Sequence, residues 1–446
     1  MFESSFMKYK ERTALITETG KGITYRELDQ LQKDMSHLIC VEGLTLVVCT
    51  NTLESIVIYL ACIQKHGTVM LEGNIREEQL KKLVEEYLPE VIFLPKKQFE
   101  EKLALKGYRY LEMGMQDYIC CKRLITGPQT YPELALLLTT SGSTGSPKHV
   151  RISYENLEKN TVAVIRSLGI CKEDRTITSL EMSYSYGLSV INTFLMSGAS
   201  IVLTDRRVYS AEFWKLAVDK GVTSFSGVPS FYEMFFRFGI QQYVPDSLKV
   251  MTQAGGAMRN GLWDNMQEYA ERHGIQFYVM YGQTEASPRI SCLPWTDMKR
   301  KKGSAGLPLD GEKITIMSSA GKFAPAGEQG EILCEGENVG LGYAYSREDL
   351  SRTDDWNGIL HTGDIGYLDC EGYLYLTGRK AGYAKVMGKR ISLAELEEIL
   401  REKCGVVCSC QETAGKIVLT GCNDTSVIKL LADITGINAR MFECIR

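Results

Sequence analysis

A loop that follows an apolar strand carries the residues best suited to chemistry. It runs from Thr139 to Lys148 and reads TTSGSTGSPK, with several hydroxyl side chains, two glycines and a closing lysine. Glycines allow backbone N–H groups to approach phosphate oxygens, hydroxyls add hydrogen-bond donors, and a lysine adds a positive charge. This composition predicts a phosphate-binding loop, and an ordinary polar turn is the alternative.

Two well-known catalytic loops do not fit this segment. The Walker pattern requires four residues between its first glycine and a Gly-Lys-Ser/Thr end, whereas Gly142 and Gly145 are followed by Pro147 and Lys148. A P-loop kinase or GTPase is therefore disfavoured. The chain also lacks a G-x-S-x-G nucleophile elbow, so Ser143 is not predicted to be a hydrolase nucleophile.

The loop is accompanied by other segments that resemble, in the same order, the motifs of the adenylate-forming (AMP-binding) superfamily. That superfamily includes acyl-CoA synthetases, aryl-acid ligases, luciferases and the adenylation domains of peptide synthetases. The segments are ITYRELDQ at 23–30, TTSGSTGSPK at 139–148, SYSYGLS at 183–189, QAGGAM at 253–258, MYGQTEAS at 280–287, HTGDIGYLDCEGYLYLTGRK at 361–380 and KVMGKRISLAELE at 385–397. A collinear set of this length is not expected by chance.

The resemblance implies an ATP- and Mg²⁺-dependent acid–thiol ligase. Such an enzyme activates a carboxylic acid as an acyl-adenylate, releases pyrophosphate, and passes the acyl group to the thiol of CoA or of a carrier protein's phosphopantetheine. Its partners would be a small carboxylic acid and, in the second case, an acyl or peptidyl carrier protein. The protein positions the acid and neutralises charge, so no nucleophilic side chain is required.

The resemblance also implies catalytic roles. Lys148 would add charge at the phosphates, Thr284 would hydrogen-bond the α-phosphate, and Glu285 would hold Mg²⁺. A solvated surface carboxylate is the alternative for Glu285. In KVMGKR, Lys385 and Gly388 match positions near the thiol entry.

Nucleotide binding would fall to the phosphate loop, the QAGGAM segment, the YGQ segment and the ribose motif. These residues are Thr140, Ser141, Gly142, Ser143, Thr144, Gly145, Gly255, Gly256, Ala257, Tyr281, Gly282, Gln283, Asp364 and Arg379. Asp364 would accept the ribose hydroxyls, with a turn-capping role as the alternative. Tyr281 would stack on the base, or simply pack in the core.

A third group of residues would line the acid pocket. It comprises Tyr184, Ser185, Gly187, Val228 and Pro229, with the segment 253–257 beside them. Amino-acid-activating members of the superfamily usually place an aspartate where this chain has Ser185. A plain α-amino acid is therefore disfavoured, and a fatty, aryl or hydroxy acid is expected.

Two further departures from the superfamily pattern concern the C-terminal part. Ala381 stands where the hinge usually carries an acidic residue, although small residues still permit a pivot. The lysine segment that reaches the reacting carboxylate is not found before Arg446, and Lys416 comes too early to replace it. The hypothesis is that residues 1–446 adenylate slowly or are a truncated form. A non-catalytic nucleotide- or acyl-binding homologue is the alternative function.

The elements that must position these residues alternate between strands and helices. Buried strands such as 44–50 and helices such as 24–39, which opens with a Thr24–Glu27 capping box, predict parallel α/β sheets. After Pro308 glycines and short strands predict a small β-rich subdomain. We expect a large N-terminal domain (1–377, with the subdomain at about 309–377), a hinge at 378–382, and a short mobile α+β cap at 383–446.

Bulk composition agrees with a multidomain enzyme. The 446 residues exceed the roughly 250–300 that one core supports. With 51 basic against 55 acidic residues and a net charge of −4, a general nucleic-acid binder is disfavoured. The N-terminus lacks a signal-peptide core, and no apolar run is long enough to span a membrane. The 14 cysteines are then expected to be cytosolic thiols, and a metal site at Cys404, Cys408 and Cys410 is disfavoured.

Overall fold

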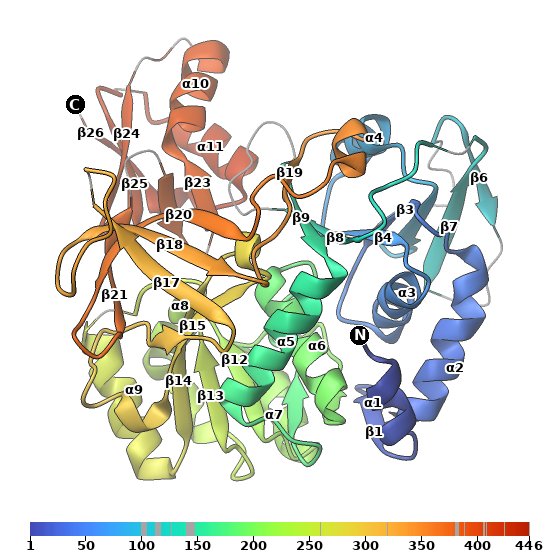
Figure 1. Ribbon diagram of the computed structural model, residues 1–446, viewed down its shortest axis with the longest axis horizontal. Coiled ribbons are helices and arrows are strands. Elements are labelled where there is room, and N and C mark those ends of the chain that lie inside the picture. The colour runs from blue at the N-terminus through green and yellow to red at the C-terminus, as the bar shows by residue number, and fades with distance from the viewer. Residues whose placement is uncertain are drawn as a thin grey trace.

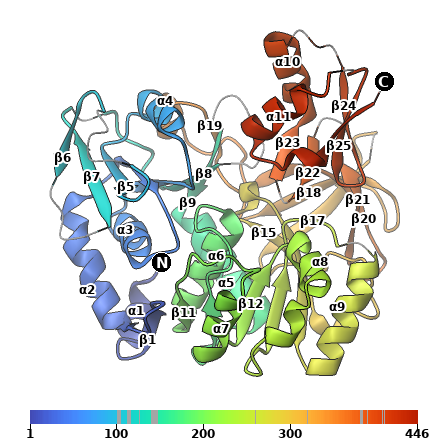
Figure 2. The same cartoon turned by 180° about the vertical axis from the view of Figure 1, so that it is seen from behind.

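The computed structural model describes residues 1–99, 105–111, 117–125, 127–139, 148–258, 260–318, 320–379, 383–387, 389–404, 406, 408–422 and 424–445. In this part of the chain, two large mixed sheets lie side by side, a small antiparallel sheet follows them, and the C-terminal segment packs beyond it (Figure 1). Figure 2 shows the same arrangement from behind.

The first large sheet carries most of the predicted site motifs at its strand ends. Its order is β16-β15-β14-β13-β12-β10-β11-β1-β2, parallel from β1 through β14 and antiparallel at both edges. The strands are β1 (Thr13–Ile16), β2 (Gly22–Thr24), β10 (Arg175–Ile177), β11 (Ser200–Val202), β12 (Ser224–Gly227), β13 (Val250–Gln253), β14 (Gln276–Gly282), β15 (Arg289–Leu293) and β16 (Leu307–Pro308).

The second large sheet has the order β19-β9-β8-β4-β3-β5-β7-β6. Its strands are β3 (Leu44–Val48), β4 (Thr68–Glu72), β5 (Val91–Pro95), β6 (Tyr108–Leu111), β7 (Tyr118–Arg123), β8 (Leu134–Thr139), β9 (His149–Ser153) and β19 (Gly342–Ala344). Strands β8, β4, β3 and β5 are parallel, as their continuous apolar sequences predict. Strands β8 and β9 flank the predicted phosphate loop and pair antiparallel.

Helices fill the space between the large sheets and cover the outer face of the first, and α4 covers the outer face of the second. They are α1 (Glu3–Lys8), α2 (Tyr25–Met35), α3 (Leu53–Gln64), α4 (Glu77–Tyr87), α5 (Tyr154–Leu168), α6 (Ser185–Ser197), α7 (Ala211–Asp219), α8 (Pro229–Arg237) and α9 (Asn260–His273). The alternation along β14 explains how one strand serves two layers: Phe277 and Val279 pack with α7, α8 and α9, whereas Tyr278 and Met280 pack with α5 and α6.

The β-rich subdomain follows β16, the edge strand of the first sheet, in the chain. Its strands are β17 (Glu312–Met317), β18 (Gly330–Gly336), β20 (Ile359–Leu368) and β21 (Leu374–Arg379), and they pair antiparallel in that order. A hairpin turn at 370–372 joins β20 to β21, and Gly372 there has a φ of +84°, a value that suits glycine.

The C-terminal segment has a hydrophobic core of its own. It contains β22 (Tyr383–Val386), β23 (Lys389–Ser392), α10 (Leu393–Cys404), β24 (Ser409–Thr413), β25 (Lys416–Thr420), α11 (Val427–Thr435) and β26 (Phe442–Ile445). The cluster of buried apolar residues in this segment extends from Ala384 to Phe442, and none of the residues described before 383 belongs to it. In Figure 1 it lies beside β18 and β20.

The expected fold class is confirmed: parallel α/β sheets, a small β-rich part and a short α+β segment are all present. The capping box of α2 is present as predicted, because the Thr24 side chain accepts a hydrogen bond from the Glu27 N–H at 3.1 Å and Glu27 accepts one from the Thr24 N–H at 2.7 Å. Within the described residues, no helix has the length and apolar character that crossing a membrane requires.

Candidate active site

The turn after β14 places two predicted catalytic side chains at the edge of the first sheet. β14 ends at Gly282, and a short 3-10 helix, Thr284–Ala286, precedes the antiparallel strand β15. A Cβ atom on Gly282 would lie 1.9 Å from the carbonyl oxygen of Pro288, so this corner requires glycine. Glu285 is only 2% exposed. Its carboxylate is therefore part of the interior rather than a solvated surface group.

Tyr343 links Glu285 to the lysine of the predicted phosphate loop. Its hydroxyl donates a hydrogen bond to Oε1 of Glu285 at 2.8 Å, and Nζ of Lys148 lies 3.6 Å from the centre of its ring. Tyr343 stands on β19, where it pairs with Val150 of β9, two residues after Lys148. One aromatic side chain thus contacts both the predicted metal-binding carboxylate and the predicted phosphate-binding lysine.

The sequence did not single out Tyr343. Its role depends on the pairing of β19 with β9, which joins residues almost two hundred positions apart. The local sequence GLGYAY offers only an aromatic residue in a glycine-rich stretch as a signal.

The two residues predicted to face the nucleoside are in direct contact. The Tyr281 hydroxyl donates to Oδ2 of Asp364 at 2.7 Å, and Asp364 is 4% exposed. The backbone N–H of Asp364 donates to Oγ1 of Thr362 at 3.1 Å, which holds the bend of β20. Asp364 also lies opposite Arg379 in the β20–β21 register. The ribose role of Asp364 and the base-stacking role of Tyr281 stay predictions.

The first turn of α6 joins the predicted acid pocket to the phosphate side. Oγ of Ser185 lies 3.1 Å from Oγ1 of Thr284, a hydrogen bond between one residue of each predicted group. Burial raises the pKa of the neighbouring Tyr184 to about 12, so its hydroxyl stays protonated. A Cβ atom on Gly187 would lie 2.1 Å from the carbonyl oxygen of Glu181, which means that Gly187 allows close backbone packing at this turn.

The QAGGAM segment packs against the same pocket. Gly255 has a φ of +85°, and a Cβ there would lie 2.6 Å from the Tyr184 hydroxyl and 3.3 Å from Cγ1 of Val228. A Cβ on Gly256 would lie 3.2 Å from Pro229. The pocket residues predicted from separate motifs therefore meet, whereas Ala257 is exposed. Gln253, at the end of β13, fixes the segment by donating from Nε2 to the carbonyl oxygen of Gly256 at 2.8 Å.

Several predicted residues lie outside what the structure describes. These are Thr140–Gly145 of the phosphate loop, Gly388, the hinge residues 380–382, and the side chains of Arg379 and Lys385. The backbones of Arg379 and Lys385 belong to β21 and β22, where Lys385 pairs with Arg390. Gly282 and Gln283 form the described corner before Thr284. Lys416 lies on β25, and its Nζ is 3.3 Å from Oε2 of Glu443.

Comparison with known proteins identifies relatives along nearly the whole chain. A family model described as AMP-binding enzyme matches residues 2–344. A 2-succinylbenzoate–CoA ligase from Bacillus cytotoxicus is 32% identical over 422 residues, which cover 93% of this chain and 82% of that protein. A protein of the same name from Bacillus cereus is 31% identical over 398 residues, covering 87% and 80% respectively.

A solved structure shares the fold over the same length. An o-succinylbenzoate CoA synthetase from Bacillus subtilis, bound with a product analogue, aligns with a TM-score of 0.79 and 25% identity. The alignment covers 99% of this chain and 94% of that one. The same Bacillus subtilis enzyme has also been solved with ATP and a magnesium ion, and that structure aligns with a TM-score of 0.66 and 25% identity.

Proposed function

Because this chain belongs to the AMP-binding enzyme family, we propose that the acid it activates is 2-succinylbenzoate and that the acyl acceptor is CoA. The chain is an ATP-dependent acid–thiol ligase of the adenylate-forming type. Its similarity to 2-succinylbenzoate–CoA ligases over 93% of its length is the observation that supports this choice of acid and of acceptor. A carrier protein as acceptor and a cytoplasmic location stay predictions.

The reaction is an exchange at phosphorus followed by an exchange at carbon. A carboxylate oxygen attacks the α-phosphorus of ATP, the bond to pyrophosphate breaks, and an acyl-adenylate forms. The thiolate sulfur of CoA then attacks the acyl carbon, and AMP leaves. The protein contributes positioning and charge neutralisation.

The residues around Glu285 suit these needs. We assign Lys148 and Thr284 to the phosphates because both lie near Glu285. Lys148 contacts the ring of Tyr343, whose hydroxyl binds Glu285, and Thr284 precedes Glu285 in the 3-10 helix. The buried Glu285 carboxylate offers the hard oxygen ligand that Mg²⁺ prefers. A magnesium ion bound there would offset charge on the phosphates. The Ser185–Thr284 contact would place the reacting carboxylate between the acid pocket and the phosphates.

A two-stage assay tests the proposal. ATP–pyrophosphate exchange is measured with 2-succinylbenzoate, benzoate, a fatty acid and an amino acid, and thioester formation is then measured with CoA and with a holo carrier protein. We expect exchange with 2-succinylbenzoate well above the other acids, and thioester formation with CoA.

The variant Glu285→Gln serves as the control, and we expect it to lower exchange by about 100-fold or more. Preferred activation of another acid would overturn the choice of acid. ATP binding without exchange for any acid would favour a non-catalytic nucleotide- or acyl-binding homologue.

A further inference from the structure

A buried arginine stands beside the acid pocket. Arg289 is the first residue of β15, where it pairs with Gly282 across from the Thr284–Glu285 turn. It is 4% exposed. The side chain of Asn160 on α5 binds both backbone groups of Arg289. Nδ2 of Asn160 donates to the Arg289 carbonyl at 2.7 Å, and Oδ1 of Asn160 accepts from the Arg289 N–H at 3.3 Å. The position of this arginine is therefore fixed.

The surroundings of the Arg289 guanidinium are aromatic and apolar. Its central carbon lies 3.9 Å from the centre of the Tyr186 ring, and Tyr184 and Cys292 are its other close ionisable neighbours. Burial lowers the pKa of Arg289 below its ordinary value, although an arginine remains charged at neutral pH. Its Nε has no hydrogen-bond partner among the described residues, and no ion pair to another described residue is formed.

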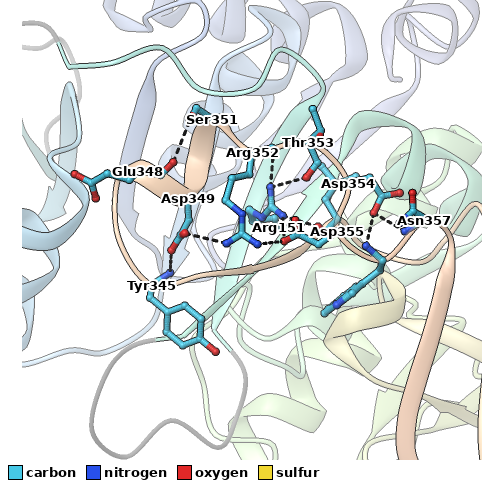
Figure 3. Close-up of polar contacts among 12 residues, drawn as sticks. Arg151, Tyr345, Glu348, Asp349, Ser351, Arg352, Thr353, Asp354, Asp355 and Asn357 are labelled. Atoms are coloured by element: carbon cyan, nitrogen blue, oxygen red, sulfur yellow. Dashed lines mark hydrogen bonds and ion pairs between the residues drawn. The ribbon is translucent and has the colours of Figure 1, made fainter.

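A second buried arginine shows what a structural role would look like. The Arg151 guanidinium donates to the carbonyl oxygens of Arg352 at 2.6 Å and Thr353 at 3.0 Å, and it pairs with Asp355 at 2.6 Å (Figure 3). It also donates to the carbonyl oxygen of Leu341 at 2.6 Å, while its Nε, like that of Arg289, has no partner among the described residues. Buried charges in proteins are normally paired and hydrogen-bonded in this way, because desolvation is costly. Among the described residues, the Arg289 side chain has no carbonyl or carboxylate partner, and its charge is met by the ring and hydroxyl of Tyr186.

A buried acid, Glu312, shares the partner Asn160 with Arg289 but does not neutralise it. Glu312 accepts a hydrogen bond from Nδ2 of Asn160 at 3.1 Å, and the same nitrogen contacts the Arg289 carbonyl. Burial raises the pKa of Glu312 well above its ordinary range, which favours the uncharged acid. The negative charge that would pair with Arg289 is therefore expected to come from a bound molecule rather than from α5, β15 or β17.

The location of Arg289 identifies what that anion belongs to. Adjacent residues of α6 contact the two sides of the site: Ser185 hydrogen-bonds Thr284, and Tyr186 packs on Arg289. The tyrosine Tyr184, whose hydroxyl meets Gly255, completes the wall. An acid whose reacting carboxylate lies at Thr284 would extend along this wall, and its far end would come to the guanidinium.

We propose that Arg289 binds a second carboxylate of the substrate, so that this ligase selects dicarboxylic acids and activates the carboxylate that lies at Thr284. The inference rests on the ligase activity described above. It does not depend on which dicarboxylic acid is used. A guanidinium suits this task because its planar N–H groups match both oxygens of a carboxylate.

Matched pairs of acids test the proposal. The first pair is 2-succinylbenzoate and 4-oxo-4-phenylbutanoate, which lacks only the aryl carboxylate, and the second pair is adipate and hexanoate. We expect kcat/KM for the diacid to exceed that for the monoacid by on the order of 100-fold in at least one pair, because a buried charge left unpaired rejects the analogue. In Arg289→Gln this ratio should fall by about 100-fold, mainly through KM for the diacid. Arg289→Lys, which keeps the charge but loses the planar fork, should retain part of the ratio.

The control variant is Arg166→Gln, since Arg166 on the exposed side of α5 forms a surface ion pair with Asp310 and its substitution should leave the ratio unchanged. Thermal unfolding checks that Arg289→Gln folds, and 2-succinylbenzoate should raise the melting temperature of the natural protein more than that of the variant. Equal kcat/KM values within both pairs, or an unchanged ratio in Arg289→Gln, would overturn the proposal.

The outcomes separate this inference from the choice of acid. A preference for adipate with no activity toward 2-succinylbenzoate would support Arg289 as a carboxylate site and refute 2-succinylbenzoate as the substrate. Activity on 2-succinylbenzoate that ignores the Arg289 substitutions would support that substrate and refute the role of Arg289.

Discussion

At the scale of single residues, the hydroxyl of Tyr343 holds the Glu285 carboxylate by a hydrogen bond of 2.8 Å. Tyr343→Phe removes this bond and keeps the ring that Lys148 contacts. A neutral hydrogen bond contributes about 0.5–1.5 kcal/mol, and one to a charged group somewhat more. We therefore expect kcat/KM for pyrophosphate exchange to fall about 5- to 20-fold, with a higher Mg²⁺ concentration needed for half-maximal rate. A Mg²⁺ titration identical to that of the natural protein would contradict a positioning role for Tyr343.

A second residue, the buried Glu312, makes the stability of the folded protein depend on pH. The folded state raises the pKa of Glu312 above the ordinary value of 4.5, because burial disfavours the carboxylate. The stability that its neutral form contributes is complete below about pH 4.5 and is lost as pH rises through the raised pKa. We predict that Glu312→Gln, which retains an oxygen for Asn160, raises the melting temperature at pH 8 by about 1–3 °C and has little effect at pH 4.5.

The exposed Glu335, which lies 3.3 Å from Lys313 on the adjacent strand, supplies the control for this measurement. Glu335→Gln should change the melting temperature little at either pH, as expected for a surface ion pair. A lower melting temperature for Glu312→Gln at pH 8 would mean that the charged form is stabilised after all.

At the scale of elements, Arg151 fastens the loop after β19 to the second sheet. Figure 3 shows its guanidinium between Arg352, Thr353 and Asp355, and the residue itself is fully buried on β9. Arg151→Gln would leave three carbonyl oxygens without their donor and Asp355 with Arg352 as its remaining partner, so we predict a loss of about 3 kcal/mol or more of unfolding free energy. Denaturant unfolding measures it, and Arg352→Gln, an exposed arginine with its own pairs to Asp349 and Asp355, is the matched control. An equal loss in both variants would show that burial of Arg151 is not the cause.

The elements themselves were largely predictable from local sequence, whereas parts of the site were not. The capping box at Thr24 and the apolar run of β3 are signals confined to a few neighbouring residues, and both elements form as predicted. Tyr343 and Arg289 gain their surroundings from strand pairing and from helices far away in sequence. The local sequence around Arg289 does not reveal that α5 and α6 bury it.

At the scale of the whole molecule, the C-terminal segment has a core that is separate from the cores of the two large sheets. Movement of this segment as a rigid body would therefore leave each apolar cluster intact. A Lys389 side chain reinforces the segment internally, because its Nζ donates to the carbonyl oxygens of Thr435 at 3.1 Å and Gly436 at 3.0 Å, at the end of α11. The proposed boundary at 378–382 is consistent with this division of the core.

This division leads to a prediction for the two half-reactions. If the segment rotates about 378–382 between adenylation and thioester formation, a rigid residue there should slow the passage between them. Gly382→Pro fixes φ at about −65°. It should reduce CoA-dependent thioester formation about 10-fold or more, while pyrophosphate exchange changes much less. Ala381→Gly, at the adjacent position, leaves the backbone free and should preserve both rates. Parallel loss of exchange and thioester formation in Gly382→Pro would place the pivot elsewhere, because a true pivot separates the two steps.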